Sequence, residues 1–486
     1  MEMLTIKEII AAVDGKLLCG NENHIVNNIV TNSKEISKGN LFIPIKGKRF
    51  DAHDFIKSAF DNGACATFTQ KENFDKSLGI FIKVKDTKIA FQKLASYYRN
   101  KFNIPIIGVT GSVGKTSTKE MIAAALLKYG NVMKTKGNLN SQLGVPMTMF
   151  QLNNNHDIAI VEMGISEPGE MKKLANIVKP SSAVITNIGI SHIENLKTRE
   201  NILKEKLYIA SYINTNIGKL YLNGSNDIIR NESGKFFDFL ESLEQNQKFR
   251  NESVIYYGID EFCDYKASDI KTIGNMTEFI LDCKFYKGKI IIPCIGAHNV
   301  YNALAGIAIA YNLGLNINDI QEGLLTYKPI AMRQQIHRLP NINLIDDSYN
   351  ASPDSMKSGI DILLKIKNNN RGIAVLADML ELGEKSKKSH FDLGTYLAKK
   401  NIEVVVTVGD EAKEIINGIR SKSNNTLTAS FQNNDDAFEY LKTIIKTSDN
   451  ILVKGSRGMR TDKIVDKILH EYSKHDCRNT NYTMQN

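Results

Sequence analysis

The segment most suited to chemistry is a glycine-rich loop, Thr110-Gly111-Ser112-Val113-Gly114-Lys115-Thr116. Its glycines let backbone N–H groups approach phosphate oxygens, Lys115 can reach the β- and γ-phosphates, and the Thr116 hydroxyl can hold Mg²⁺. An apolar run at 104–109 precedes the loop, and a helical pattern ending near Gly130 follows it. The start of such a helix adds positive potential. This strand–loop–helix order predicts an enzyme that uses ATP.

The spacing of the glycines departs from the strict phosphate-loop pattern, G-x-x-x-x-G-K-[ST]. That pattern needs glycine at position 109, where this chain has Val109, and the glycines available are Gly108 and Gly111. The departure disfavours an ordinary Walker-type NTPase. A motor or switch that hydrolyses ATP to drive partner binding is therefore the weaker alternative.

Three later residues have side chains that suit a metal site beside ATP. Glu162 follows an apolar run at 158–161, His192 follows another at 183–188, and Lys206 lies in a helical pattern. A carboxylate at a strand end supplies the hard oxygen that Mg²⁺ prefers. A glutamate in this position is more often a solvated turn residue, a lone histidine is more often structural, and a helical lysine is usually on the surface. The residues alone leave both interpretations open.

Composition limits the class of protein. The chain has 486 residues, which suggests about three domains. The net charge of +9 is carried without a long basic tract or an interleaved aromatic stripe, which disfavours nucleic-acid binding. Its six cysteines form no C-x-x-C pair, which argues against a disulfide framework or a zinc site. No apolar run of membrane-spanning length and no signal peptide is evident, so we expect no membrane insertion and a cytoplasmic location.

Alternating apolar strands and amphipathic helices predict an α/β fold of three domains. We expect an N-terminal α/β domain at 1–100, a central, mostly parallel sheet at 101–326, and a Rossmann-like, doubly wound domain at 327–486. Strand-like runs of the last domain lie at 342–345, 373–376, 404–408 and 451–453. Ligands bind beyond the carboxyl ends of such strands, where the sequence has Asp346, Asp347, Asp378, Gly409 and 454–456.

Several motifs in this order resemble those of the Mur ligases, the ATP-dependent amide-bond ligases of peptidoglycan synthesis. The glycine-rich loop, Glu162-Met163-Gly164 and Asn187-Ile188-Gly189-x-x-His192 carry the general resemblance. Longer motifs are similar to those of the family member that adds a dipeptide. They are Gly137-Asn138-Leu139-Asn140, Gly144-Val145-Pro146, Gly296-Ala297-His298-Asn299-Val300-x-Asn302-Ala303, 346–356, Asp378-Met379-Leu380-Glu381-Leu382-Gly383-Glu384 and Lys454-Gly455-Ser456-Arg457-Gly458-Met459.

The resemblance implies a reaction and a division of labour. ATP would phosphorylate the terminal carboxylate of UDP-N-acetylmuramoyl-tripeptide, and D-alanyl-D-alanine would attack the acyl phosphate, giving the pentapeptide precursor of peptidoglycan. The N-terminal domain would bind the UDP-sugar, the central domain ATP, and the C-terminal domain the dipeptide while closing on ATP. We expect a monomer. The alternative is a related ligase that adds a single amino acid, either another Mur ligase or one similar to folylpolyglutamate synthase. The presence of Lys115, Glu162 and His192 disfavours a non-catalytic scaffold.

The resemblance also implies roles for individual residues. Lys115, Glu162, His192 and Lys206 would be catalytic. Mg²⁺ would be held by Thr116, Glu162, His192 and a carbamate on Lys206, with Lys204 as the near alternative. ATP would contact residues 110–116, His298, Asn302, Arg333 and Asp347. The UDP-sugar would contact Ser33, Lys46, Gly47 and Asn138. The dipeptide would contact Tyr349, Asn350 and Ser352.

The N-terminal domain departs from the family pattern in two places. Asn32-Ser33-Lys34 stands where Asp-Ser-Arg is expected, and Asp51-Ala52-His53 stands where Asp-Gly-His is expected. The first change removes a carboxylate and a guanidinium fork, which lysine does not replace. Ser33 is therefore the residue of this region that we most expect to bind the substrate.

Overall fold

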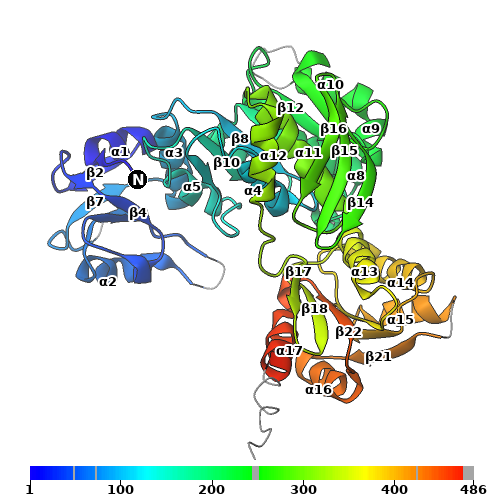
Figure 1. Cartoon of the computed structure of the whole chain (residues 1–486). Helices are drawn as coiled ribbons and strands as arrows, with labels where there is room; N and C mark the ends of the chain where they lie inside the picture. The colour runs from blue at the N-terminus through cyan, green and yellow to red at the C-terminus, as the bar shows by residue number, and fades with distance from the viewer. Residues whose placement is uncertain (48–49, 72–73, 243–250, 423–424, 474–486) are drawn as a thin grey trace, which may run out of the picture.

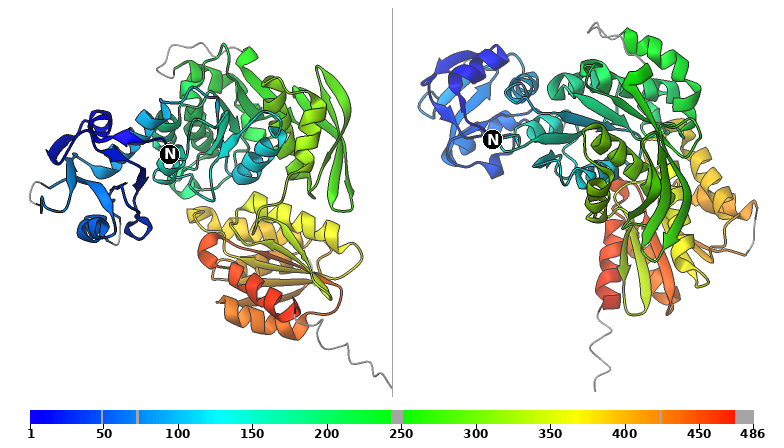
Figure 2. Two further views of the ribbon diagram at one scale, coloured as in Figure 1. Left: turned by 60° about the vertical axis from the view of Figure 1, so that its left-hand side comes forward. Right: turned by 45° about the horizontal axis from the view of Figure 1, so that its top comes forward.

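The computed structural model describes residues 1–47, 50–71, 74–242, 251–422 and 425–473. Within these ranges the chain forms three α/β domains, each with its own main sheet. The N-terminal and C-terminal domains adjoin the central domain from different sides, as the views in Figures 1 and 2 show. The predicted α/β class with three domains is thus confirmed.

The N-terminal domain has a mixed sheet in the order β2-β7-β6-β5-β4, in which only β2 is antiparallel to its neighbour. A two-stranded ladder of β1 and β3 lies beside it. The strands are β1 (Leu4–Thr5), β2 (Lys16–Cys19), β3 (Ile25–Val26), β4 (Asn28–Val30), β5 (Asn40–Phe42), β6 (Ala64–Thr69) and β7 (Ile80–Lys83), and the helices are α1 (Ile6–Val13), α2 (Ile56–Asp61) and α3 (Thr87–Arg99).

The central domain is built on nine strands among the described residues, in the order β16-β15-β14-β13-β12-β11-β8-β10-β9. From β14 to β9 the neighbours are parallel, and β14, β15 and β16 form an antiparallel meander. The strands are β8 (Ile106–Thr110), β9 (Val132–Lys134), β10 (Ile158–Glu162), β11 (Ser182–Ile185), β12 (Leu220–Asn223), β13 (Val254–Gly258), β14 (Tyr265–Ile273), β15 (Met276–Cys283) and β16 (Tyr286–Ile292).

Both faces of this sheet are covered by helices, because successive strand residues point to opposite faces. On β10, Ile158 and Ile160 pack with α4, α11 and α12, whereas Ala159 and Val161 pack on the other side with α5, α6 and α8. The helices are α4 (Lys115–Ala125), α5 (Gly144–Met149), α6 (Glu170–Val178), α7 (Ile193–Leu196), α8 (Arg199–Leu207), α9 (Asp227–Asn231), α10 (Ser233–Glu241), α11 (Ala297–Asn312) and α12 (Ile317–Leu325).

The C-terminal domain is a doubly wound sheet in the order β17-β18-β22-β19-β20-β21, of which only β17 is antiparallel to its neighbour. The strands are β17 (Gln335–Arg338), β18 (Ile342–Asp347), β19 (Gly372–Ala377), β20 (Val404–Val408), β21 (Leu427–Phe431) and β22 (Asp449–Lys454). The helices are α13 (Pro353–Lys367), α14 (Ser386–Leu397), α15 (Lys413–Arg420), α16 (Asn434–Ile444) and α17 (Asp462–Ser473).

Two elements near the glycine-rich loop are shorter than the periodicity predicts. The strand expected at 183–188 ends at Ile185. The next residue, Thr186, still donates its N–H to the Thr110 carbonyl oxygen (2.9 Å), and its hydroxyl donates to the Val113 carbonyl oxygen (2.5 Å). The helix expected to run toward Gly130 ends at Ala125 and is followed by hydrogen-bonded turns.

Candidate active site

The glycine-rich loop is held in shape by the segment that follows β11. Gly111 has a φ of +153°, and a Cβ at this position would lie only 1.9 Å from the Thr186 hydroxyl oxygen, so no other residue fits. The Val113 N–H donates to Asn187 Oδ1 (2.7 Å) while its carbonyl accepts from Thr186. The loop is thus preformed, with α4 beginning directly after it.

Lys115 begins α4 and folds back over the loop. Its Nζ donates to the Gly111 carbonyl oxygen (2.8 Å). Burial lowers the pKa of Lys115, and the nearby Glu162 charge works against this shift while Arg333 adds to it. An ammonium held in this way gains strongly from an anion, so the position suits contact with nucleotide phosphates.

Glu162 ends β10 with its carboxylate in the interior. One oxygen, Oε1, accepts from the Asn140 side-chain amide (2.7 Å), and the Glu162 N–H donates to Thr135 Oγ1 (2.9 Å). The other oxygen, Oε2, is buried and has no hydrogen-bond partner in the part of the chain that is described. A buried carboxylate oxygen without a donor is suited to a cation.

Asn140 was not identified from the sequence, although it lies in the motif that contains the predicted Asn138. Asn138 is exposed and does not line the cavity described below, whereas Asn140 lines the cavity and contacts Glu162. Only the motif itself could have drawn attention to Asn140.

His192 lies in the turn before α7, in the left-handed region with a φ of +60°. Its Nδ1 is 2.5 Å from Oε2 of Glu381, which lies in the loop after β19 of the C-terminal domain. The imidazole lowers the pKa of Glu381. The predicted metal ligand therefore has a carboxylate partner in another domain, which sequence reasoning did not identify.

The two candidate lysines of α8 differ sharply in environment. Lys206 is 2% exposed, and burial, assisted by the Lys115 charge, lowers its pKa well below the ordinary value. Lys204 is exposed and lies over the Phe239 ring at 5.4 Å. A neutral amine is the form that reacts with CO₂, so the environment favours Lys206 over Lys204 as the lysine to be carbamylated.

A cavity of about 820 Å³ lies between the central and C-terminal domains. Most of the predicted ATP, metal and dipeptide residues line it. They are Ser112, Val113, Gly114, Lys115, Thr116, Glu162, His192, His298, Asn302, Arg333, Asp347, Tyr349, Asn350 and Ser352. The predicted residues that do not line it are Thr110, Gly111, Lys206, Asn138, Ser33, Lys46 and Gly47.

The C-terminal wall of the cavity is built on a buried ion pair. Asp347 ends β18 and Lys454 ends the neighbouring β22, and the parallel register places them side by side. Lys454 Nζ lies 2.7 Å from Asp347 Oδ2 and donates to the Asn350 carbonyl oxygen (2.9 Å). Burial raises the pKa of Asp347, and the Lys454 charge opposes this shift. From the sequence, Lys454 was placed at a strand end and in a family-like motif, without a role of its own.

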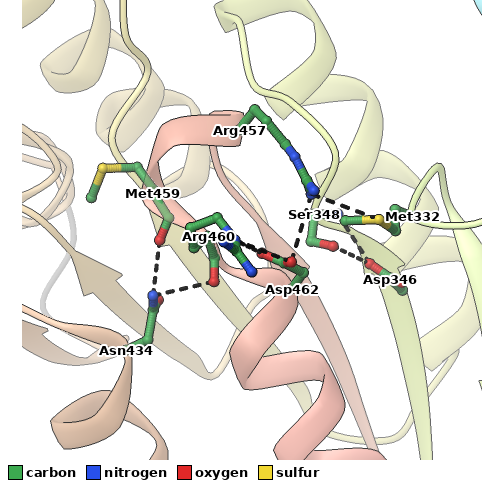
Figure 3. A network of polar contacts seen from close by, with 8 residues as sticks. All are labelled: Met332, Asp346, Ser348, Asn434, Arg457, Met459, Arg460 and Asp462. Carbon is green, nitrogen blue, oxygen red and sulfur yellow. Dashed lines mark hydrogen bonds and ion pairs between the residues drawn. The ribbon is translucent and has the colours of Figure 1, made fainter. Parts of the chain in front are cut away.

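A polar network positions the segment that links the two domains, as Figure 3 shows. Met332 has a φ of +62°, and its carbonyl accepts from the Tyr349 N–H (3.1 Å). The Arg457 guanidinium reaches the Met332 sulfur (3.8 Å) and an Asp462 carboxylate oxygen (3.6 Å). Arg333 then stacks its guanidinium 4.0 Å from the Tyr349 ring centroid. The linking segment is therefore held to the C-terminal domain beside the cavity.

On the opposite side, α11 contributes Asn302 and His298. Asn302 Oδ1 accepts from Thr118 Oγ1 (2.7 Å), and its amide donates to Asn299 Oδ1 (3.0 Å). These bonds tie α11 to α4, the helix that carries the glycine-rich loop. Burial lowers the pKa of His298 to about 4, so this imidazole is neutral at physiological pH.

The residues present fit Mg²⁺ held largely by a nucleotide. The protein itself offers few ligands, because no cluster of three or more His, Cys, Asp or Glu side chains is found among the described residues. Magnesium in phosphate-transfer sites commonly takes one or two carboxylates and fills its other positions with phosphates and water. Thr116, His192 and the partnerless Glu162 oxygen supply such a partial set.

No helix within the described ranges combines the length and apolar character needed to cross a membrane.

Three protein-family models match the chain in succession. They are the Mur ligase family catalytic domain at residues 25–110, the Mur ligase middle domain at 109–310, and the Mur ligase glutamate ligase domain at 332–457.

Known relatives cover nearly the whole chain. The chain is 33% identical to the UDP-N-acetylmuramoyl-tripeptide–D-alanyl-D-alanine ligase of Bacillus subtilis over 96% of this chain and 98% of that protein. Among solved structures, it is similar to MurF from Acinetobacter baumannii, with a TM-score of 0.86, 28% identity, and coverage of 97% and 100%. It is also similar to MurF ligase from Thermotoga maritima in complex with ADP, with a TM-score of 0.79, 28% identity, and coverage of 92% and 98%.

Proposed function

This chain belongs to the Mur ligase family, and we propose that it joins D-alanyl-D-alanine to UDP-N-acetylmuramoyl-tripeptide with ATP. It is an ATP-dependent ligase that forms a C–N bond, and its product is the pentapeptide precursor of peptidoglycan. The names of its full-length relatives support this choice over a ligase that adds one amino acid.

One observation carries the proposal: a single cavity joins the nucleotide loop to the C-terminal strand ends. Lys115 and Glu162 face it from the central domain, and Asp347 and Tyr349 face it from the C-terminal domain. Ligation requires ATP, a carboxylate and an amine to meet at one place. A cavity of about 820 Å³ is within the range of pockets that hold ligands of drug size.

The proposed reaction has two steps. The tripeptide carboxylate oxygen attacks the γ-phosphorus of ATP, ADP leaves, and an acyl phosphate forms. The dipeptide amine, after losing a proton, then attacks the acyl carbon, and inorganic phosphate leaves as the amide forms. The first step brings two anions together, so its barrier falls mainly through positioning and charge stabilisation.

The residues of the cavity suit these demands. Lys115 would move from the Gly111 carbonyl to a phosphate oxygen and offset its negative charge. Mg²⁺, held by Thr116, Glu162 and His192, would supply further positive charge at the phosphates. We propose that Lys206 carries a carbamate that serves this metal site, because burial lowers the pKa of its amine well below the ordinary value and so favours the neutral form that reacts with CO₂.

We propose that the three domains divide the substrates. Residues 1–100 would bind the UDP-sugar through Ser33, Lys46 and Gly47, with Asn138 contributed from the central domain at 101–326. Residues 327–486 would bind the dipeptide through Tyr349, Asn350 and Ser352 and close on ATP. His298, Asn302, Arg333 and Asp347 would contact the nucleotide. We further propose a monomer acting in the cytoplasm, where ATP is available.

The mass of the product tests this function directly. The full chain would be incubated with ATP, Mg²⁺, D-alanyl-D-alanine and UDP-N-acetylmuramoyl-tripeptide whose third residue is either diaminopimelate or lysine. We expect one tripeptide or both to gain the mass of the dipeptide less water, with one ADP and one phosphate per product. Parallel reactions contain D-alanine or glutamate in place of the dipeptide. No adduct with either tripeptide, or preferential addition of a single amino acid, would overturn the assignment.

A further inference from the structure

A buried lysine of the central domain has no role in the reaction proposed above. Lys119 lies in the second turn of α4, the helix that begins directly after the glycine-rich loop, and is 1% exposed. Its Nζ donates to the Thr135 carbonyl oxygen (2.6 Å) and lies 3.2 Å from Oε1 of the neighbouring Glu120. The ammonium therefore links α4 to the residue that follows β9.

Thr135 in turn joins the ends of two neighbouring strands. Its N–H donates to the Ile160 carbonyl oxygen of β10 (3.0 Å), and its hydroxyl oxygen accepts from the Glu162 N–H (2.9 Å). Because Thr135 is 1% exposed, these bonds form away from solvent. Thr135 is thus held on one side by the end of β10 and on the other side by Lys119.

The loop that begins at Thr135 returns to the end of β10 at Asn140. The Asn140 side-chain amide donates to Glu162 Oε1 (2.7 Å), and its carbonyl oxygen accepts from the Gly164 N–H (2.8 Å). Residues 136–138, between these two anchored ends, are exposed. The order of the loop therefore depends on the contacts of Thr135 and Asn140.

We propose that Lys119 is a positioning residue that fixes the loop at 135–140 relative to α4 and so prepares it to bind the UDP-tripeptide. This inference rests on the proposed function, which assigns Asn138 of this loop to the UDP-sugar. Asn140 lines the cavity, whereas Lys119 does not and acts from behind the loop. A segment that is already ordered loses less conformational entropy when a ligand binds, so it binds that ligand more tightly.

Packing alone is the competing account of this buried lysine. Removing an ammonium from water is costly, and an apolar residue of similar size often stabilises a protein interior at least as well as a buried ion pair. A methionine would fill the space of Lys119 without its hydrogen bond. Glu120 would keep an ion-pair partner, because it also pairs with the exposed Lys134. Lys119→Met therefore tests the contact with Thr135.

Two pairs of variants separate positioning from packing. Lys119→Met is compared with Lys134→Met, a matched control that loses a lysine beside Glu120 but leaves the bond between Lys119 and Thr135 in place. Thr135→Val is compared with Thr135→Ser, because valine lacks the hydroxyl that accepts from Glu162 and serine keeps it.

Two measurements would be made on each full-length protein. Amide hydrogen exchange without ligands reports the order of the loop, at residues 135–142 and 158–164, with β12 as the internal reference. Steady-state kinetics give the KM for the UDP-tripeptide and the KM for D-alanyl-D-alanine. A substitution that only weakens packing would speed exchange throughout the central domain and leave both KM values unchanged.

We expect Lys119→Met and Thr135→Val to speed exchange in the two segments about tenfold while exchange in β12 stays the same. The KM for the UDP-tripeptide should rise about fivefold. The KM for the dipeptide should not change, because we propose that the C-terminal domain binds it. Lys134→Met and Thr135→Ser should match the wild type.

Wild-type exchange in both segments of Lys119→Met, or an unchanged KM for the UDP-tripeptide, would overturn the inference. So would exchange that rises equally in β12, because that result would assign Lys119 to packing. If Lys119→Met does not fold, Thr135→Val decides by the same criteria. If the wild type makes no ligated product, the proposed function fails, while the exchange rates still show whether Lys119 holds the loop.

Discussion

The central domain meets its two neighbours through interfaces of opposite character. Toward the N-terminal domain the apolar core is continuous, and α3 ends inside it with Tyr98, which has no exposed surface. The Tyr98 hydroxyl donates to the Leu152 carbonyl oxygen (2.7 Å), and Arg99 Nε donates to that of Val178 (2.8 Å). Toward the C-terminal domain there is instead a cavity bordered by polar side chains.

The difference indicates which domain moves. An apolar, hydrogen-bonded interface fixes two domains as one body, whereas a polar one permits relative motion. We infer that the N-terminal and central domains stay together and that the C-terminal domain moves relative to them. Substitutions at the interface with the N-terminal domain should therefore lower the free energy of unfolding. Substitutions at the cavity toward the C-terminal domain should instead lower activity.

The largest expected effect is that of Lys115→Ala at the cavity. We expect ADP formation to fall by about 10³-fold or more, because a preformed positive group is lost where charge develops. The thermal unfolding midpoint should not fall, since burial already disfavours the Lys115 charge. Coupled ADP release and a thermal melt are the measurements. Activity near the wild-type level would show that the loop does not hold the reacting phosphates.

Tyr98→Ala, at the interface with the N-terminal domain, should lower stability, whereas Lys115→Ala should lower activity. Removing a fully buried aromatic ring costs about 3–5 kcal/mol of unfolding free energy, measured by urea denaturation. The matched control is Tyr349→Ala, because Tyr349 is only half-buried beside the cavity and should cost less than about 1 kcal/mol. Similar losses in the two variants would mean that the interfaces do not differ as inferred.

Lys206→Gln tests the buried amine. We expect about a 10²-fold loss of activity with little change from Lys204→Gln, the exposed control. Burial lowers the pKa of Lys206, so the amine is neutral above that lowered pKa and becomes protonated as the pH falls through it. The ¹³C signal of a carbamate, recorded with ¹³CO₂, should therefore be present at neutral pH and weaken on acidification. A wild-type chain with no such signal at any pH would contradict the carbamate.

Ser33→Ala should have the smallest effect and a different kinetic signature. Loss of one hydrogen bond, about 1 kcal/mol, should raise the KM for the UDP-tripeptide about fivefold. The KM for ATP should stay the same, because Ser33 lies outside the cavity. Steady-state kinetics with each substrate varied in turn would measure both constants. A change confined to ATP would contradict the assignment of this domain to the UDP-sugar.

The sequence by itself determined the parts that depend on local patterns. Apolar periodicity predicted β8, β10 and four of the C-terminal strands, β18, β19, β20 and β22, but neither β17 nor β21. The order strand–loop–helix predicted that Lys115 meets phosphates. The rule that ligands gather beyond strand ends identified Asp347. The strand predictions succeed because side-chain alternation acts over a few residues. The roles of Lys115 and Asp347 in binding ligands stay predictions.

Only the tertiary structure decided which distant groups meet. Asp347 is paired with Lys454 because β18 and β22 are neighbours in parallel register, and no local pattern specifies that order. Glu381 reaches His192 only because two turns from different domains come into contact. Lys206 is buried and Lys204 is exposed, although both lie on α8. The sequence of this helix has almost no amphipathic pattern that would predict the difference. In each case the deciding contact joins residues remote along the chain, and packing of whole domains sets it.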